Sequence, residues 1–320
     1  MKLNLSLVLL IVIAFAASLL AGRVWLPPDA IFSAHDTLAG LIVQDVRLPR
    51  SVLALIVGAT LGLSGAVLQG FTRNPLAEPA LLGVSSGAAL GAVIAIYFGL
   101  AALSPVTAPL MGMVGALLAC GLTFGLGRNG TVALVLAGAA VSSLTAAGIA
   151  LALNFAPSPY AAYEIMSWLL GSLADKSWTQ VMLVLPFVIA GGALLALTGR
   201  ALDALALGEA QAASLGVNPA RLAALVVAGT ALSVGAITSV TGAIGFIGLV
   251  APHLVRPFVG YSPRRVLLPA TLAGALLLLC ADIAARLVHT NPELRLGVFT
   301  SRLGTPFFFW LVVRIRKVAP

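Results

Sequence analysis

The side chains that could bind a nucleotide or a metal are few in this sequence and wrongly spaced for either task. Lysine occurs at Lys2, Lys176 and Lys317, and none of them ends the GxxxxGK loop that cradles phosphate. His, Cys, Asp and Glu do not recur at the spacing of metal ligands, so no metal site and no bound cofactor are expected. No nucleophile–base constellation is evident either, which argues against an enzyme.

His253 and Asp282 fall inside apolar stretches, where ionisable residues often have a function. For His253 a structural hydrogen bond is favoured, and Asp282 is expected in the outer part of its stretch. An ion-coupled secondary transporter needs ionisable groups in mid-membrane, whereas Asp203, Glu209 and Glu293 fall in loops or at the ends of apolar stretches. An ion-coupled secondary transporter is therefore not the favoured function, but it stays open as an alternative one.

The elements that position these residues are expected to be membrane-spanning helices. Hydrophobic residues make up 60% of the 320 positions and charged residues only 9%, against about 25% charged in soluble domains. Apolar stretches of about 20 residues, the length that spans a bilayer, recur along the whole chain. The sequence predicts one all-α polytopic domain over 1–320 with ten transmembrane helices at 3–22, 51–71, 82–101, 107–126, 131–154, 179–199, 221–240, 243–259, 265–288 and 297–315.

The distribution of positive charge predicts which side of the membrane each loop occupies. An even number of spans places both termini on one side, and cytoplasmic loops are enriched in Lys and Arg. With the N-terminus inside, eleven of the eighteen basic residues are cytoplasmic. An N-in/C-in orientation is therefore predicted, and the net charge of +8 is read as topology rather than as nucleic-acid binding. A signal peptide at 1–22 is disfavoured because the apolar run is long enough to span and further spans follow.

Small residues suggest how the helices pack. Glycines at four-residue spacing, as at Gly83, Gly87 and Gly91, allow close helix contacts. The stretch 58–67 resembles 228–237, and each leads into a segment broken by Pro or Gly, at 74–79 and 242–248. The second copy begins five spans after the first, and this odd offset predicts inverted-repeat-like halves, with the broken segments near a transport path. Cys120 and Cys280 are read as core residues rather than as a disulfide.

The segment 200–221 differs from the sequence around it because it is polar, long and, by the predicted topology, cytoplasmic. Its pattern predicts two short amphipathic helices at 201–207 and 209–215, ended by Gly216 and Asn218-Pro219. A structured loop of this kind suits docking to a soluble partner, and a merely decorated loop is the alternative.

Several long motifs carry a family resemblance from Arg47 onward. They are RLPR at 47–50, NPLAEPxLLGVSSGA at 74–88, LALGExxAxSLG at 205–216, GAIGFIGLVAPHLVR at 242–256, LLPATLAGALLLLxADxxAR at 267–286 and PELRLGVFTxxLGTPFFFWLV at 292–312. In this order they resemble the permease subunits of type II ABC importers for iron–siderophore complexes, haem and vitamin B12, the FecCD family.

The resemblance implies an importer permease that moves a metal chelate from periplasm to cytoplasm by alternating access. The expected cargo is an iron–siderophore or haem, ahead of vitamin B12. The implied partners are a second permease copy or a similar permease, two ATPase subunits that hold ATP-Mg, and a periplasmic substrate-binding protein. The expected location is the bacterial inner membrane, surrounded by lipid.

The resemblance also assigns roles to individual positions. The ATPase-coupling loop would contain Leu207, Gly208, Glu209, Leu215 and Gly216; binding-protein docking would use Arg47, Arg50 and Arg286; the cytoplasmic gate would contain Asn74, Leu76, Thr131 and Val132. The family's gate has a hydroxyl where Val132 stands. The arginines could instead be ordinary anchors at the membrane interface.

The translocation path is expected along the fifth span. Ser142, Ser143 and Thr145 are the candidate lining residues, although their hydroxyls could equally bond to their own helix. Arg302, a departure from the family pattern, could attract an anionic substrate at the outer mouth, or could be a snorkelling side chain.

Overall fold

The computed structural model describes residues 2–33, 35, 37–127, 130–288, 290 and 293–318, with the side chains of 312 and 314–318 left out. Within these ranges every regular element is helical, as predicted. The α-helices are α1 (Lys2–Leu20), α2 (Leu38–Leu41), α3 (Leu48–Phe71), α4 (Val84–Tyr97), α5 (Thr107–Leu126), α6 (Thr131–Asn154), α7 (Pro159–Leu169), α8 (Trp178–Leu197), α9 (Gly199–Leu205), α10 (Glu209–Ser214), α11 (Pro219–Thr241), α12 (Ile247–Val255), α13 (Pro263–Leu287) and α14 (Leu296–Val318). A π-helix, Ile42–Arg47, joins α2 to α3, and short 3₁₀ turns at Pro28–Phe32, Pro79–Leu82, Leu100–Ala102 and Arg256–Phe258 complete the chain.

The length of the helices supports a polytopic membrane protein but not the full count of ten spans. Seven helices of the described residues are long and apolar enough to cross a bilayer. α4 has 14 residues and α12 only nine, and a nine-residue helix is about 14 Å long. The predicted span 243–259 is therefore wrong as a continuous helix. α7 was not predicted at all.

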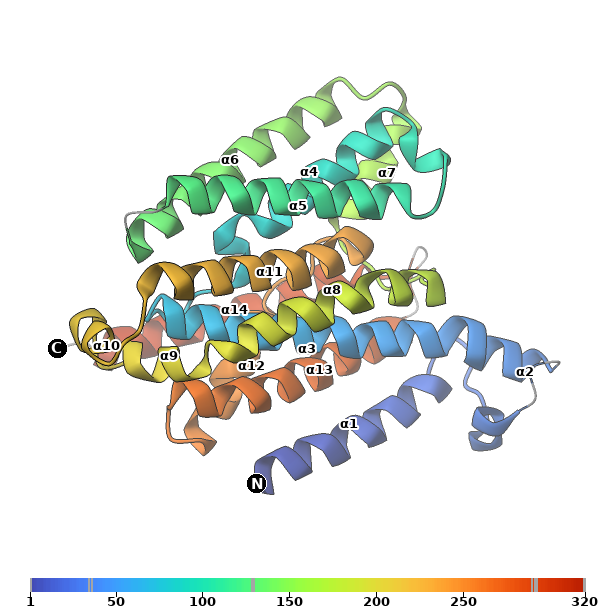
Figure 1. Cartoon of the computed structure of the whole chain (residues 1–320). Coiled ribbons are helices and arrows are strands. Elements are labelled where there is room, and N and C mark those ends of the chain that lie inside the picture. The colour runs from blue at the N-terminus through green and yellow to red at the C-terminus, as the bar shows by residue number, and fades with distance from the viewer. Residues whose placement is uncertain are drawn as a thin grey trace.

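Figure 1 shows α9 and α10 at one end of the helical bundle and α2 at the other. We call these the α10 end and the α2 end. α3 starts at the α2 end and α11 starts at the α10 end, so the two helices of the predicted repeat run in opposite directions, as an inverted repeat requires.

The starts of several helices follow from local sequence. Ser158, Asn218 and Ser262 each precede a proline that opens a helix, and each side-chain oxygen accepts a hydrogen bond from the backbone N–H three residues later. Proline suits this first position because it has no N–H to satisfy and its φ angle is already helical. These caps fix where α7, α11 and α13 begin.

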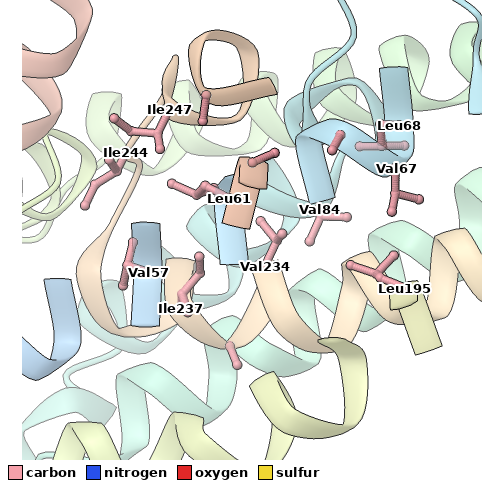
Figure 2. Close-up of a cluster of buried hydrophobic side chains, with 14 of the residues drawn as sticks. Val57, Leu61, Val67, Leu68, Val84, Leu195, Val234, Ile237, Ile244 and Ile247 are labelled. Atoms are coloured by element: carbon pink, nitrogen blue, oxygen red, sulfur yellow. The ribbon is translucent and has the colours of Figure 1, made fainter. Parts of the chain in front are cut away.

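The core of the bundle is built around α3. Figure 2 shows Val57, Leu61, Val67 and Leu68 of this helix among buried side chains from α4, α8 and α11 and from the segment that leads into α12. α3 and α13 approach so closely that a Cβ atom added to Gly58 would lie 2.3 Å from the carbonyl oxygen of Gly274. Cys120 is buried in this core, whereas Cys280 is exposed on α13, so the prediction of a core residue is wrong for Cys280.

Candidate functional site

The three arginines expected to dock a binding protein gather at the α2 end, where all three are hydrogen-bonded; Arg47 and Arg286 are buried and Arg50 is half-buried. Arg47 ends the π-helix, Arg50 lies in the first turn of α3, and Arg286 lies in the last turn of α13. Arg47 and Arg286 have exposed fractions of 8% and 6%. Their partners within the chain were not predicted.

Arg47 binds the end of α1. Its Nη1 donates to the carbonyl oxygens of Leu19 at 2.9 Å and Leu20 at 2.6 Å, and its Nη2 donates to that of Val24 at 2.6 Å. The last carbonyls of a helix have no partner inside the helix, and a cation there is favoured. Arg47 thus acts as a cap that ties α1 to the start of α3.

Asp282 is the centre of a second set of bonds. Its side chain is 0% exposed and receives Arg50 from α3, with Nη2 2.8 Å from Oδ1, and Arg286 from its own helix, with Nε 2.8 Å from Oδ2. Arg286 also donates to the carbonyl and hydroxyl oxygens of Ser18 at 2.9 and 2.8 Å. The i,i+4 spacing of Asp282 and Arg286 is a signal that sequence reasoning missed.

Arg50 has a further carboxylate partner, Glu293, in the segment between α13 and α14. Nη1 lies 3.3 Å from Oε2, and Nη2 forms an ion pair with Oε1. Arg50 therefore faces two carboxylates from different parts of the chain, which satisfies its fork of N–H donors within the subunit.

The predicted coupling loop forms two short helices at the α10 end, α9 and α10, as the sequence indicated. Gly208 and Gly216 have φ values of +112° and +82°, which favour glycine, and they frame α10. Leu207 and Leu215 are 65% and 64% exposed beside these glycines. Two exposed leucines on this helical loop form an apolar surface that a soluble protein could cover.

A cavity of about 640 Å³ connects this loop to part of the predicted gate. It is lined by the end of α3, the end of α5, the start of α6, the coupling loop and the start of α11, with Thr131 and Glu209 among the lining residues. Val132, the next residue along α6, is 74% exposed. The structure thus brings one gate candidate next to the coupling loop.

The other gate candidates lie in the turn after α3. Asn74 closes this turn by accepting a hydrogen bond from the backbone N–H of Leu76 at 2.9 Å. Arg73 and Pro75, beside Asn74, line a separate cavity of about 300 Å³. Arg73 also pairs with Glu209 at 2.8 Å, so an ion pair links this turn to the coupling loop.

Glu78 lies farther along the same segment, between α3 and α4. Burial raises the pKa of its carboxyl, and a hydrogen bond from the backbone N–H of Phe246 partly offsets the rise. Phe246 precedes α12 in a left-handed conformation with φ +67°. Glu78 therefore links the segments 74–79 and 242–248, the two segments broken by Pro or Gly that follow the copies of the predicted repeat.

The candidate path residues on α6 bond mainly to their own helix. Ser143 donates to the carbonyl oxygen of Ala139 at 2.9 Å, and the buried Thr145 donates to that of Val141 at 3.0 Å. Ser142 instead accepts from Ser86 of α4 at 3.3 Å. Ser143 is exposed on the isolated subunit. The back-bonding alternative holds for Ser143 and Thr145, and lining of the path stays a prediction.

Two further candidates lie on or against α14. Arg302 is exposed. The ring of His253 packs edge-on against Phe307, with 6.0 Å between ring centroids, which is a helix-packing contact. Among the described residues, no group of three or more His, Cys, Asp or Glu could hold a metal ion.

Comparison with known proteins covers nearly the whole chain. The sequence model of the FecCD transport family matches residues 9–314. The vitamin B12 import system permease protein BtuC of Klebsiella pneumoniae is 40% identical over 314 residues, which are 97% of this chain and 93% of that protein. Its counterpart in Vibrio cholerae is 42% identical over 303 residues, 92% of this chain and 89% of that protein.

A solved structure agrees with the sequence comparison. An ABC transporter of the metal-chelate type in an inward-facing conformation superposes with a TM-score of 0.89 at 32% identity, covering 98% of this chain and 99% of that one.

Proposed function

The chain belongs to the FecCD transport family of membrane permeases, and from this premise we propose that it is the translocation subunit of an ATP-driven importer in the bacterial inner membrane. It would carry a metal chelate from periplasm to cytoplasm between two permease halves, powered by two separate ATPase subunits. The observation that supports this most is the separation of two regions: a coupling loop with exposed leucines at the α10 end, and a largely buried arginine cluster at the α2 end.

The contacts of the coupling loop suggest how ATP hydrolysis would reach the path. Glu209 at the start of α10 pairs with Arg73, which precedes Asn74, and it shares a cavity with Thr131. A displacement of α10 by an ATPase would therefore act on both predicted halves of the gate, and interfaces of this kind shift between discrete packed states.

The order in which cargoes should be tested follows from the cargoes named for the similar proteins. The curated relatives reported above import vitamin B12, and the solved neighbour is of the metal-chelate type. These proteins do not single out an iron–siderophore or haem, the cargoes that the sequence led us to expect first. We therefore propose vitamin B12 as the first cargo to test, with haem and a ferric siderophore next.

The alternative, an ion-coupled transporter, loses its best candidate residue. Asp282 is fully buried, but two arginines neutralise it. A carboxylate held in this way has little capacity to take up a coupling ion. Most of the remaining carboxylates fall in loops or at helix ends, as predicted.

The decisive experiment measures ATPase activity of the purified complex in lipid nanodiscs. Binding protein loaded with vitamin B12, haem or a ferric siderophore is added in turn, and stimulation by one loaded form, with vanadate-sensitive uptake, supports the importer. Uptake that a protonophore abolishes and vanadate leaves intact would overturn it.

A matched pair of variants tests the coupling loop. Leu215→Asp should abolish copurification of the ATPase, because it places a charge on the apolar docking surface. Leu103→Asp alters a similarly exposed leucine, 76% against 64%, in the loop between α4 and α5 near the α2 end, and should not. Equal copurification of both variants would contradict the coupling role.

A further inference from the structure

The arginines at the α2 end differ in whether their hydrogen-bond acceptors can move away without disrupting a helix. Arg47 is bound to backbone carbonyls at the end of α1, and Arg286 to Ser18 and to Asp282 within its own helix. A further acceptor of Arg47, the carbonyl oxygen of Val24, lies in the exposed bend after α1, but the other acceptors are parts of α1 or α13. Releasing them would require α1 to separate from α3 and α13, so Arg47 and Arg286 are fixed structural links.

Arg50 has one fixed partner and one that is able to leave. Asp282 is 0% exposed in the middle of the ion-pair cluster, whereas Glu293 is 29% exposed and lies outside any helix. Both oxygens of Glu293 face the two terminal nitrogens of Arg50. Rotation of the Glu293 side chain would expose this face of Arg50 without breaking a helix.

We propose that Glu293 holds Arg50 in the undocked permease, and that a carboxylate of the docking soluble protein replaces it there. This rests on the proposed function, which supplies a protein that docks at the α2 end. A guanidinium that is 12% exposed is costly to leave unpaired, so one carboxylate is exchanged for another rather than simply lost. Glu293 then moves to solvent, where its charge is hydrated.

The geometry at Arg50 favours a protein carboxylate as the occupant. The two terminal N–H groups of Arg50 already donate side by side to the planar carboxylate of Glu293, which is the fork geometry that arginine provides. Anionic lipid headgroups are the competing occupant that the test must exclude.

Chemical modification tests the exchange without the partner. Phenylglyoxal reacts with accessible guanidinium groups. The intact complex is modified, and mass spectrometry of its peptides then reports each arginine separately. Arg50 should be modified about tenfold faster in the Glu293→Gln variant than in the wild type, while Arg47 and Arg286 stay slow in both. The Glu164→Gln variant is the matched control, because Glu164 is an exposed carboxylate on α7. Equal Arg50 rates in wild type and Glu293→Gln would overturn the proposal.

Binding measurements then test the replacement itself. The probe is the binding protein that stimulates the ATPase in the experiment above. Glu293→Gln should tighten its binding about tenfold relative to Glu164→Gln, and the bound protein should protect Arg50 from phenylglyoxal. If Glu293→Gln is poorly folded, Glu293→Asp, which keeps the charge but shortens the side chain, should show a smaller change in the same direction.

Each remaining outcome has a distinct meaning. Identical affinity of the Glu293 and Glu164 variants, with weaker binding by Arg50→Lys, would overturn the exchange and leave docking by Arg50 intact. Unchanged affinity in Arg50→Lys and Arg50→Ala alike would remove docking at this cluster and with it the premise. Protection of Arg50 by phosphatidylglycerol nanodiscs without binding protein would assign the place to lipid and overturn the proposal.

Discussion

Asp282 is the residue on which the charge balance of the α2 end depends. It is fully buried and forms ion pairs with both Arg50 and Arg286, which belong to two different helices. A buried ion pair adds little net stability compared with apolar packing, but removing one partner leaves an uncompensated buried charge. An Asp-to-Asn change keeps the shape of the side chain but removes its charge, so it still leaves the buried arginines without a counter-charge.

We expect Asp282→Asn to lower the stability of the permease by about 3 kcal/mol. The measurement is thermal unfolding in detergent. Heated samples are analysed by size-exclusion chromatography with intrinsic-fluorescence detection, and the remaining folded peak gives the melting temperature. Asp29→Asn, at an exposed aspartate in the 3₁₀ turn after α1, is the control and should be neutral. A melting temperature of Asp282→Asn equal to that of the control would show that the arginines find other counter-charges.

Glu78 gives the fold a pH-dependent element. Because burial raises the pKa of its carboxyl above 4.5, the folded state binds the proton more tightly than the unfolded chain does. Its stabilising contribution is complete below pH 4.5 and is lost as the pH rises through the higher folded-state pKa.

Glu78→Gln should remove this component, because the amide imitates the protonated carboxyl. The variant should melt at a higher temperature than the wild type near pH 7, and its melting temperature should fall less between pH 4.5 and pH 7 than that of the wild type. Glu164→Gln serves as the reference for a simple loss of negative charge. A wild-type profile parallel to that of Glu78→Gln would contradict the assignment.

At the scale of elements, the close approach of α3 and α13 depends on glycine. A Cβ atom on Gly274 would lie 2.2 Å from the carbonyl oxygen of Gly58, and one on Gly62 would lie 2.2 Å from that of Ala270. Backbone atoms on both sides leave no flexible side chain to move aside. This pair of helices also positions Arg50 and Asp282, so its spacing determines the geometry of the ion-pair cluster.

Gly274→Ala should therefore destabilise the bundle by about 1–3 kcal/mol, the usual cost of overpacking a tight core. Gly125→Ala on α5 is the matched change, since nothing lies within 4 Å of the added Cβ, and it should be neutral or slightly stabilising because alanine favours the helix. Thermal unfolding of both variants side by side decides the point. A Gly274→Ala variant as stable as Gly125→Ala would mean that the helices separate without cost.

At the scale of the whole molecule, the two functional surfaces must face opposite sides of the membrane. α1 begins toward the α10 end and α14 finishes there, which agrees with an even number of crossings. Which side each end faces was predicted from the excess of basic residues on the loops at the α10 end.

Cysteine labelling tests this orientation. In a Cys120→Ser, Cys280→Ser background expressed without the ATPase subunits, Leu207→Cys should react with a membrane-impermeant maleimide only after the cells are permeabilised. Phe32→Cys, at a side chain 89% exposed near the α2 end, should react in intact spheroplasts. The reverse pattern would invert the topology, and labelling of both from one side would rule out the spanning bundle.

The sequence alone determined the membrane class, most of the long helices and the coupling-loop helices. These depend on local properties: the length of an apolar run, a Ser-Pro or Asn-Pro helix start, and glycines at positive φ around Gly208 and Gly216. The order of the motifs likewise pointed to the family that the comparisons confirmed.

Only the tertiary structure decided the environment of the arginine cluster and the true length of α12. Arg50 meets Asp282 and Glu293 across 232 and 243 residues of chain, and neither motif spacing nor helical periodicity carries that information. The stretch 242–246 is apolar enough to read as a continuation of α12, yet Phe246 lies in a left-handed turn where it packs against Gly304 of α14. In both cases the outcome depends on which distant groups share a buried space, because burial makes an unpaired charge or a poorly packed ring costly.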